Sequence, residues 1–541
     1  MRRVVLVVIA LLLGCQQPPR APQPARPDVD LVVLLVIDQL PVWAFDRDRP
    51  LYRGGLARLL REGAYAVAEL PHANTFTAPG HATIGTGAPP SIHGVIGNQW
   101  YRRDELRALP AEHDPEAAMF SVIAPEMLAE VASAKALRVD GLADVLREAT
   151  HGRARSVAIA LKARAATMVA GRRPDLAVWF DADAGGMTTS CGYADAPPSW
   201  LLELARARPA ARFVGQTWAP LDRELLARAT QIDDDGPGEA TVHGLGIGFP
   251  HVIAELGAIV RTPFGDDVVL DAALAAIDAL ELGDDDVPDL LAVSFNAHDY
   301  AGHTWGPDSW ESLDLTLRLD DALGRLFEAL DREVGASRWA VVLTSDHGAT
   351  PLVERGGVAD ARRIPTMEVA AAIDDALAAR LGPGPWVQAV LSNQVYLAPR
   401  WHQVDATLRD AALEEAADAI ARLRGIAGVY RADRTTGACE ARDGLERAVC
   451  YALADEASGD LYLVPARGSL ITDYPNGTHH DAPNDDNRKV PILVRAPGLA
   501  PHVTQGSLLQ VAPTVSALLG VPPPPAATAP PLFGLAPVPA R

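Results

Sequence analysis

Two short segments of the sequence each place a carboxylate beside an imidazole. Asp299 and His303 are four residues apart, so on a helix they would lie one turn apart and could bind one metal ion. Asp346 and His347 are adjacent, and both can reach one ion only if the backbone turns sharply, which Gly348 permits. Taken alone each pair is a weak signal, since a surface Asp with a helix-capping role would explain Asp299 better.

More oxygen and nitrogen ligands lie elsewhere in the chain. Asp38 follows an apolar run, and His479 and His480 lie in a polar loop. Catalytic zinc sites commonly use three protein ligands and keep one position open, so the sequence predicts two zinc ions. Two such ions about 4 Å apart would hold the attacking and leaving oxygens of a phosphoryl transfer. The expected ligands divide into two sets: Asp299, His303 and His480, and Asp38, Asp346 and His347.

The segment from Thr75 to His81 is the expected source of a nucleophile, because it precedes a helical stretch. A hydroxyl at a helix N-terminus lies where free backbone N–H groups favour the charge of a phosphorylated intermediate, and zinc would promote its ionisation. Thr77 is the best placed and is predicted to be both nucleophile and zinc ligand. Two residues before Pro79, it would also suit a helix N-cap, and Thr75 and Thr83 remain alternative nucleophiles.

Short continuous apolar runs predict the strands that would position these residues. Such runs, separated by helical patterns, are typical of strands buried on both faces of a parallel sheet. The alternation predicts an α/β fold with a doubly wound, mostly parallel central sheet, helices on both faces and inserted α+β segments. The runs span residues 31–37, 156–161, 290–295 and 339–343, and the clearest helical pattern spans residues 310–333.

Polar residues follow the ends of these apolar runs. In doubly wound sheets, ligands bind beyond the carboxyl ends of the strands. We therefore expect four side chains that are far apart in the sequence to face one crevice. They are Asp38, Lys162, Asp299 and Asp346.

The chain divides into an N-terminal targeting region, a large folded body and a tail. Ten apolar residues near the N-terminus are too few to span a bilayer, and Leu12-Leu13-Gly14-Cys15 resembles the lipobox of bacterial lipoproteins. This predicts an exported protein, periplasmic or anchored in the outer membrane through Cys15, with an ordinary cleaved signal as the alternative. The predicted parts are a signal peptide (1–14), a Pro-rich tether (15–29), a catalytic domain (30–520) with insertions near 185–285 and 365–465, and a Pro-rich tail (521–541).

Composition limits the classes of function. Hydrophobic residues make up 48% and charged residues 22% of the chain, as in ordinary soluble globular proteins. The formal charge of -21 opposes binding to nucleic acid, although cations gathered in one cleft would still bind an anionic substrate. Cys439 and Cys450 are close enough in sequence to form a disulfide, and three buried thiols including Cys191 are the alternative.

Several motifs follow one another along the chain: Asp38, Thr77-Ala-Pro-Gly-His81, Thr86-Gly87, Ile92-His-Gly94, Gly97-Asn98, Asp299-x-x-x-His303, Gly306-Pro307, Ser345-Asp-His-Gly348 and Val511-Ala-Pro-Thr-Val-Ser-Ala-Leu-Leu519. In type and order they resemble the nucleotide pyrophosphatase and phosphodiesterase branch of the alkaline phosphatase superfamily. Within that branch the chain is most similar to the bacterial periplasmic alkaline phosphatases of the PafA type. The resemblance extends from about residue 30 to about residue 520.

The resemblance implies roles for four residues. In that type a threonine replaces the more familiar serine nucleophile, which maps onto Thr77, and an asparagine that contacts the phosphate maps onto Asn98. A Lys-x-Arg pair maps onto Lys162 and Arg164. Without the other motifs, this pair would be interpreted as a solvated strand end.

The chain departs from that family around the last metal ligand. Family members usually have Thr-His-Gly, whereas this chain has Thr478-His479-His480-Asp481, so the ligand is either His479 or His480. Lys489 stands where a second histidine is common. Tyrosine and glycine residues usual in this loop are missing, so its shape is expected to differ.

Charge balance favours a phosphate monoester as substrate. Two zinc ions bring four positive charges, and three aspartates and a Thr77 alkoxide remove them, which leaves the bare site near neutral. A monoester dianion then needs two further cations, which Lys162 and Arg164 provide, whereas a diester with one charge gains less from them. The prediction is a two-zinc alkaline phosphatase that hydrolyses phosphate monoesters through a phosphothreonine.

Other functions place different demands on the sequence. A phosphodiesterase, nucleotide pyrophosphatase or phosphonate hydrolase would use the same metals, but Lys162 and Arg164 argue against it. A sulfatase is disfavoured because neither Cys-x-Pro-x-Arg nor Ser-x-Pro-x-Arg occurs. A noncatalytic surface lipoprotein would show eroded metal ligands, yet every expected position is filled.

Overall fold

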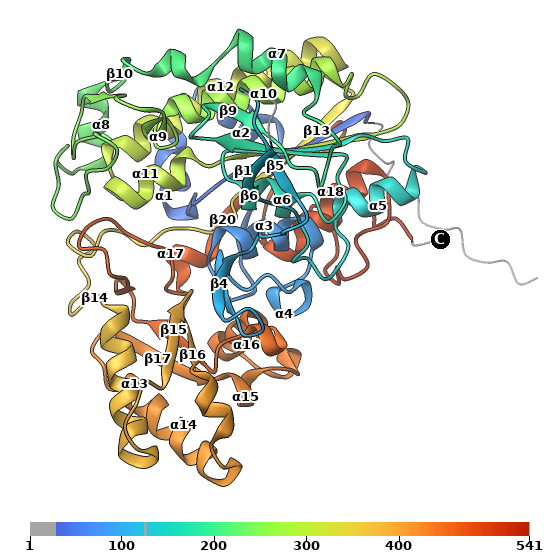
Figure 1. Cartoon of the computed structure of the whole chain (residues 1–541). Coiled ribbons are helices and arrows are strands. Elements are labelled where there is room, and N and C mark those ends of the chain that lie inside the picture. Colours follow the sequence, from blue (N-terminus) through green and yellow to red (C-terminus); the bar gives the residue numbers. More distant parts are fainter. Residues whose placement is uncertain (1–28, 124–126, 540–541) are drawn as a thin grey trace, which may run out of the picture.

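A large sheet crosses the main body of the protein, and helices flank both of its faces (Figure 1). The structure, a computed structural model, describes residues 29–123 and 127–539. The predicted α/β fold is confirmed. The strands in spatial order are β21 (Val503–Ser507), β2 (Ala64–Glu69), β20 (Lys489–Arg495), β13 (Trp339–Thr344), β1 (Leu31–Ile37), β12 (Asp289–Phe295), β7 (Ser156–Ala160), β8 (Leu176–Asp181) and β9 (Gly186–Thr188).

The centre of this sheet is parallel. Strands β13, β1, β12, β7 and β8 run in the same direction. Continuous apolar runs form them because both faces of the sheet are covered, and all seven residues of β1 are buried. Antiparallel pairing occurs toward the edges, where β20 pairs with β13 and β2 and where β9 pairs with β8. The sheet is therefore mixed around a parallel centre.

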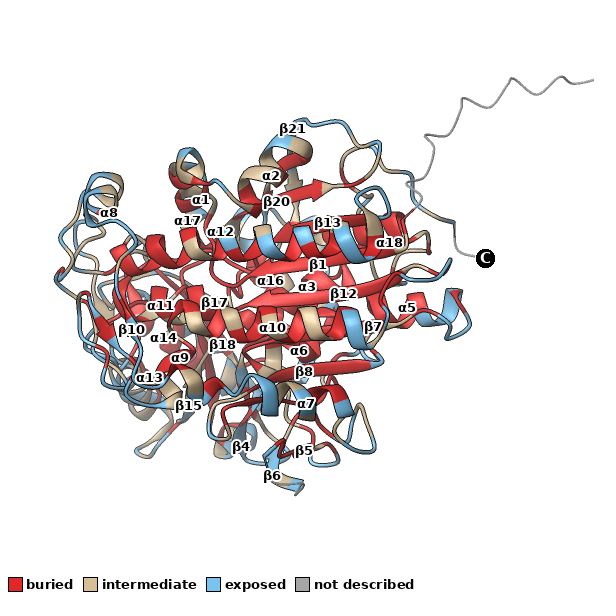
Figure 2. Ribbon diagram, turned by 90° about the horizontal axis from the view of Figure 1, so that it is seen from above, coloured by how far each residue is buried: buried red, intermediate tan, exposed pale blue. Residues whose placement is uncertain are grey.

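Each face of the sheet has its own hydrophobic core. In β1 the odd-numbered residues belong to one core and the even-numbered residues to the other. Figure 2 shows the strands as a buried layer between helices that are exposed on their outer sides. The first core is covered by α2 (Gly55–Glu62), α10 (Pro263–Ala279) and α12 (Trp310–Leu330), and the second by α5 (Leu142–Ala149), α6 (Ala163–Val169) and α18 (Val511–Leu519).

A smaller antiparallel sheet, which we call the small sheet, lies apart from the large one in the lower part of Figure 1. Helices α13 (Thr366–Leu381) and α14 (Ala406–Ala421) pack on it around a separate hydrophobic core. It falls within the stretch near 365–465 for which an insertion is predicted. Its strands in spatial order are β15 (Val387–Leu391), β16 (Gln394–Leu397), β18 (Leu461–Pro465) and β17 (Ile426–Arg431).

The other stretch for which an insertion is predicted lies near 185–285. Its last part is α10, which packs against β12 and β7 and so belongs to the helical layer of the large sheet. The preceding part carries α7 (Ser199–Ala207), β10 (Thr217–Trp218), α8 (Arg223–Thr230), β11 (His251–Val252) and α9 (Leu256–Ile259).

The structure decides between a disulfide and three buried thiols. The structure joins Cys439 to Cys450 in a disulfide, near helix α16 (Gly444–Ala452). Cys191 is a free and exposed cysteine. The alternative of three buried thiols is therefore wrong.

The predicted signal peptide and Cys15 lie outside the described residues, as does almost all of the tether. Across residues 29–123 and 127–539, no helix is both long and apolar enough to cross a membrane.

The parallel strands bring four polar residues to one edge of the large sheet. Asp38 follows β1 directly, and its N–H donates to the carbonyl of Phe295 at the end of β12. Lys162 follows β7, and Asp346 follows β13. Asp299 lies on α11 (Ala297–Trp305), which begins just after β12. Because these strands are parallel neighbours, their carboxyl ends lie at the same edge.

Helix α3 (Thr77–Thr86) approaches this edge closely. The helix begins at Thr77, and its N-cap is Phe76. The interpretation of Thr77 as the N-cap is therefore wrong by one residue. A Cβ atom on Gly80 would lie 2.4 Å from the Asp346 carbonyl oxygen and 2.7 Å from Asp346 Cβ. Gly80 therefore permits a contact that a larger residue would block.

We expect Gly80→Ala to impair the predicted activity although alanine is the better helix former. The added methyl group must displace Asp346, and a displacement of about 1 Å at a catalytic group costs roughly 10²-fold in rate. Gly324→Ala in α12 is the matched control, because a Cβ there would meet its nearest atom at 3.6 Å. Thermal unfolding and kcat/KM measured for both variants test this. Wild-type activity in Gly80→Ala would contradict the close approach.

Candidate metal centre

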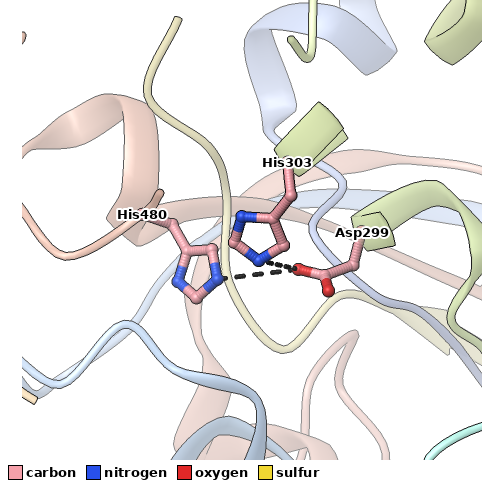
Figure 3. A group of neighbouring side chains, drawn as sticks. All are labelled: Asp299, His303 and His480. Carbon is pink, nitrogen blue, oxygen red and sulfur yellow. Dashed lines mark ion pairs between the residues drawn. The ribbon is translucent and has the colours of Figure 1, made fainter. Parts of the chain in front are cut away.

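Asp299, His303 and His480 meet at the edge of the large sheet, and we call them the first ligand group. Figure 3 shows Asp299 and His303 projecting from one helix toward His480, which comes from a distant loop. Asp299 Oδ1 lies 3.3 Å from His303 Nε2 and 3.6 Å from His480 Nε2. The predicted spacing of one helical turn thus brings the first two residues together on α11.

Asp38, Asp346 and His347 form a second ligand group. His347 Nε2 lies 3.5 Å from Asp38 Oδ1 and 3.4 Å from Asp346 Oδ2. All three side chains are fully buried. The His347 and His480 rings stack with centroids 3.7 Å apart, so the two ligand groups are neighbours.

The second ligand group has unused donor atoms directed at one another. Asp38 Oδ1 and His347 Nε2 are buried and have no hydrogen-bond partner, and the buried Asp346 Oδ2 has His81 Nδ1 3.1 Å away. Buried polar atoms are normally satisfied, so the Asp38 and His347 atoms, side by side with Asp346, fit a cation-binding site. Three nitrogen and oxygen donors match the ligand number and type of a catalytic zinc site. The residues therefore fit a zinc ion.

Each histidine of the two groups is oriented by its second ring nitrogen. His303 Nδ1 lies 2.6 Å from the carbonyl of Thr478, and His347 Nδ1 lies 2.9 Å from the carbonyl of Gly348. His480 Nδ1 bonds to the carbonyl of Thr75. A proton on Nδ1 that is donated to a carbonyl leaves Nε2 free to bind a metal.

The geometry favours His480 over His479 as the candidate ligand. His480 belongs to the first ligand group, whereas His479 Nε2 lies 3.2 Å from the hydroxyl of Thr472. Burial, His303 and His480 lower the pKa of His479 to about 3. Lys489 pairs with Asp485 at 2.6 Å, away from both ligand groups.

The buried carboxylates dominate the electrostatics of the site. Burial raises the pKa of Asp38, and the Asp299 and Asp346 carboxylates raise it further. Burial also opposes ionisation of Asp299, but His303 and Lys162 hold its pKa well below the ordinary value. For His347, burial and the adjacent His480 ring hold the pKa well below its usual range, which keeps the imidazole neutral. Close carboxylates and neutral imidazoles are the environment that a cation stabilises.

Lys162 lies between the two ligand groups. Its Nζ donates to Asp38 Oδ2 at 2.7 Å and to Asp299 Oδ2, and it lies 3.4 Å from Thr77 Oγ. Burial opposes the charge of Lys162, but these two carboxylates raise its pKa above the ordinary value. The interpretation of Lys162 as a solvated strand end is therefore wrong, since it is 4% exposed.

Thr77 is the threonine whose hydroxyl faces Lys162. The other two candidates are engaged elsewhere: Thr75 donates to the carbonyl of His480, and Thr83 Oγ lies between His72 and His93. Thr77 is the first residue of α3, so its hydroxyl lies in the positive field of the free backbone N–H groups at this end of the helix.

Arg164 and Asn98 carry polar groups that the protein leaves available. Arg164 Nε is buried without a hydrogen bond. Burial opposes its charge, while Glu112 and Tyr300 contribute to a raised pKa. Asn98 Oδ1 accepts the N–H of Ala78 at 2.8 Å, which aims its amide at the first turn of α3. Both side chains therefore have donors left for a ligand.

Asn296 is a functional residue that the sequence reasoning missed. Its Oδ1 accepts the N–H groups of Leu161 and Lys162 at 2.8 and 3.2 Å, and its Nδ2 donates to Asp38 Oδ2 at 2.8 Å. It therefore fixes the end of β7 and one metal ligand together. Asn296 directly follows the apolar run that ends at Phe295, just as Asp38 follows an apolar run. A search for polar residues at the ends of such runs would therefore have identified it.

His81 is the last residue of the Thr77-Ala-Pro-Gly-His81 motif, and the sequence indicated no role for it. Its Nδ1 lies 2.9 Å from the carbonyl of Thr77 and 3.1 Å from Asp346 Oδ2, and its Nε2 lies 2.8 Å from the Ser294 hydroxyl. His81 thus ties the first turn of α3 to a ligand of the second group and to β12.

The chain is similar to known proteins over most of its length. Residues 32–489 match the family model described as type I phosphodiesterase / nucleotide pyrophosphatase. Alkaline phosphatase PafA of Elizabethkingia meningoseptica is 29% identical and covers 95% of both chains. Alkaline phosphatase PhoV of Synechococcus elongatus is 31% identical over 93% of this chain and 92% of the relative. The crystal structure of wild-type alkaline phosphatase PafA has a TM-score of 0.87 at 28% identity, covering 94% of this chain and 99% of that one.

Replacing Asn296 with alanine should disturb stability and activity together. It leaves two buried N–H groups unpaired, so we expect the free energy of unfolding to fall by about 2–3 kcal/mol. It also releases Asp38 and Lys162, so kcat/KM should fall by roughly 10²-fold. Urea unfolding and steady-state kinetics measure both effects. Asn476→Ala, at an exposed position, should change stability by less than about 0.5 kcal/mol. An equally small change for Asn296→Ala would refute the role.

Proposed function

The chain belongs to the type I phosphodiesterase / nucleotide pyrophosphatase family, and we propose that it hydrolyses phosphate monoesters with two zinc ions and with Thr77 as nucleophile. It is a phosphoric monoester hydrolase of the alkaline phosphatase type, as its similarity to two alkaline phosphatases over more than nine-tenths of the chain supports. The observation that carries the zinc and threonine roles is the convergence of two ligand groups, Lys162 and the Thr77 hydroxyl.

The two ligand groups would each hold one zinc ion. When bound, the ions would supply Lewis-acid stabilisation of the attacking and leaving oxygens. Histidine Nε2 atoms and carboxylate oxygens are the ligands, and the backbone carbonyls on the Nδ1 atoms fix the tautomers. Asp38 is further held by Asn296, and Asp346 by the N–H of Gln39 at 3.1 Å.

The chain's own residues support a two-step displacement. Thr77 Oγ forms a bond to phosphorus as the ester P–O bond breaks, and the alcohol leaves. A water oxygen then attacks phosphorus, the P–Oγ bond breaks, and Thr77 and inorganic phosphate are released. Lys162 Nζ, 3.4 Å from Thr77 Oγ, stabilises the ionised oxygen, and the N-terminus of α3 favours the added phosphoryl charge.

Two cations match the charge of a monoester. Lys162 contacts Asp38 and Asp299, while Arg164 has a buried Nε without a partner. A monoester carries a second negative charge that a diester lacks, so donors of this type favour the monoester. Asn98 contributes an amide N–H to an equatorial phosphate oxygen.

The second candidate is a phosphodiesterase with the same metal centre, which the description of the matched family favours. It would bind a bulky ester group where the monoester presents a free oxygen. Export, and anchoring through Cys15, complete the proposal; this residue lies outside the described part of the chain.

Alanine variants of Lys162 and Arg164 separate the two candidates. We expect kcat/KM for an aryl phosphate monoester to fall by roughly 10²–10³-fold in each variant, the usual cost of one transition-state donor. For the matching methyl diester the loss should be less than about tenfold, because one negative charge is absent. Equal losses on both substrates, or a wild-type preference for the diester, would favour the phosphodiesterase.

Thr77→Ala tests the covalent step. We expect turnover to fall to near background, because no hydroxyl remains to accept the phosphoryl group, while Thr77→Ser retains much of it. Elemental analysis should still find two zinc ions in the alanine variant. Acid quenching of wild-type enzyme during turnover, followed by mass spectrometry, should find phosphate on the peptide containing Thr77. Full turnover in Thr77→Ala would end this assignment.

A further inference from the structure

Arg355 binds the C-terminal end of the helix that carries two metal ligands. Its Nη2 donates to the carbonyl of Trp305, the last residue of α11, at 2.6 Å and to Asp308 Oδ1 at 2.9 Å. A cation at a helix C-terminus is favoured by the helix dipole and satisfies carbonyls that lack helical partners. Trp305 is two residues beyond His303. Arg355 therefore fixes the end of the helix next to this ligand.

Gly306 makes this contact sterically possible. It follows α11 with a φ of 95°, and a Cβ atom there would lie 2.4 Å from Arg355 Nη2. The glycine is thus needed both for its left-handed backbone and for the space that the guanidinium occupies. The sequence indicated no role for the Gly306-Pro307 motif. In the structure, Gly306 leaves the space in which the Arg355 guanidinium lies.

The other terminal nitrogen of the guanidinium binds a loop that contacts both α11 and the segment before His480. Arg355 Nη1 donates to Glu239 Oε1, and the Glu239 side chain is 1% exposed. The next residue, Ala240, donates its N–H to the carbonyl of Thr304 on α11. The preceding residue, Gly238, accepts the N–H of Gly477 at 2.8 Å. The Glu239 loop therefore lies between α11 and the segment that leads to His480.

The segment before His480 is in turn hydrogen-bonded to His303. The N–H of Thr478 donates to the carbonyl of His303 at 2.9 Å, and the carbonyl of Thr478 accepts from His303 Nδ1. A displacement of the Glu239 loop would move this carbonyl and the His480 segment together. One guanidinium thus contacts α11 directly and the His480 segment through a single loop.

We propose that Arg355 is a positioning residue for the first ligand group, setting the separation and orientation of His303 and His480. The proposal rests on the zinc centre proposed above. Its side chain is 7% exposed and does not belong to either ligand group, so its effect must pass through these contacts. Partners that orient metal ligands usually contribute about 10–100-fold to metal affinity.

The test measures zinc affinity in the full-length enzyme. Wild type and Arg355→Gln are dialysed against a series of chelator-buffered free zinc concentrations, and bound zinc is measured by elemental analysis beside kcat/KM. We expect one of the two zinc ions to bind about 10–100-fold more weakly in the variant and the other to be unchanged. Saturating zinc should restore kcat/KM to within about tenfold. His303→Ala identifies the affected ion, because it should lose the same one.

Two further variants guard against a general loss of folding. Arg355→Gln leaves Glu239 buried without its cation, so the double variant Arg355→Gln/Glu239→Gln removes that charge and should keep the selective zinc defect. Arg58→Gln is the matched control, since Arg58 is also partly buried and bonds Asp331 through both terminal nitrogens. Its melting temperature should fall while both zinc affinities stay at the wild-type value.

The outcomes are distinct. Unchanged zinc affinities in Arg355→Gln and in the double variant, or equal weakening of both ions, would overturn the positioning role and leave Arg355 a structural residue. Failure of the zinc proposal itself would look different, because the wild-type enzyme would then bind fewer than two zinc ions.

Discussion

Three buried carboxylates, those of Asp38, Asp299 and Asp346, converge in one small volume, and the organisation of the site follows from their repulsion. In a buried environment such charges cost several kcal/mol each unless cations balance them. The Lys162 ammonium contacts one carboxylate of each ligand group, Asp38 and Asp299, but one ammonium cannot neutralise three carboxylates. The balance therefore needs additional positive charge, which Asp38 Oδ1, buried without a hydrogen-bond partner, is placed to receive.

The small sheet is part of this arrangement, although it lies apart from the large one. Asn393, in the turn between β15 and β16, donates its amide to the carbonyl of Asp481 at 2.5 Å. Tyr462 on β18 donates to the side chain of Asn74 at 2.8 Å. The first contact supports the loop of His480 and the second supports the segment before Thr77. The small sheet thus contacts two irregular segments near the site, the loop of His480 and the segment between β2 and α3.

Strand ends were predictable, and the orientation of loop residues was not. Strands buried on both faces are continuous apolar runs, so the residue that ends each run, such as Asp38, marks the edge of the sheet. The helical spacing of Asp299 and His303 is equally local. The choice between His479 and His480 depends instead on Thr472 and Thr75, which are distant in sequence or lie in irregular segments. Arg355 was not predicted for the same reason, since its partners come from two segments that are distant from it in sequence.

The histidine ligands are oriented by main-chain carbonyls, and this explains how the loop tolerates an unusual sequence. The Nδ1 atoms of His303, His347 and His480 each meet a backbone carbonyl. A carbonyl is present whatever side chain follows, so the orientation of His480 depends on the path of the backbone. A second histidine before it, and an aspartate in place of the usual glycine after it, therefore leave the Nε2 atom of His480 beside Asp299. What such changes do alter is the surface around the first ligand group, where His303 remains 29% exposed.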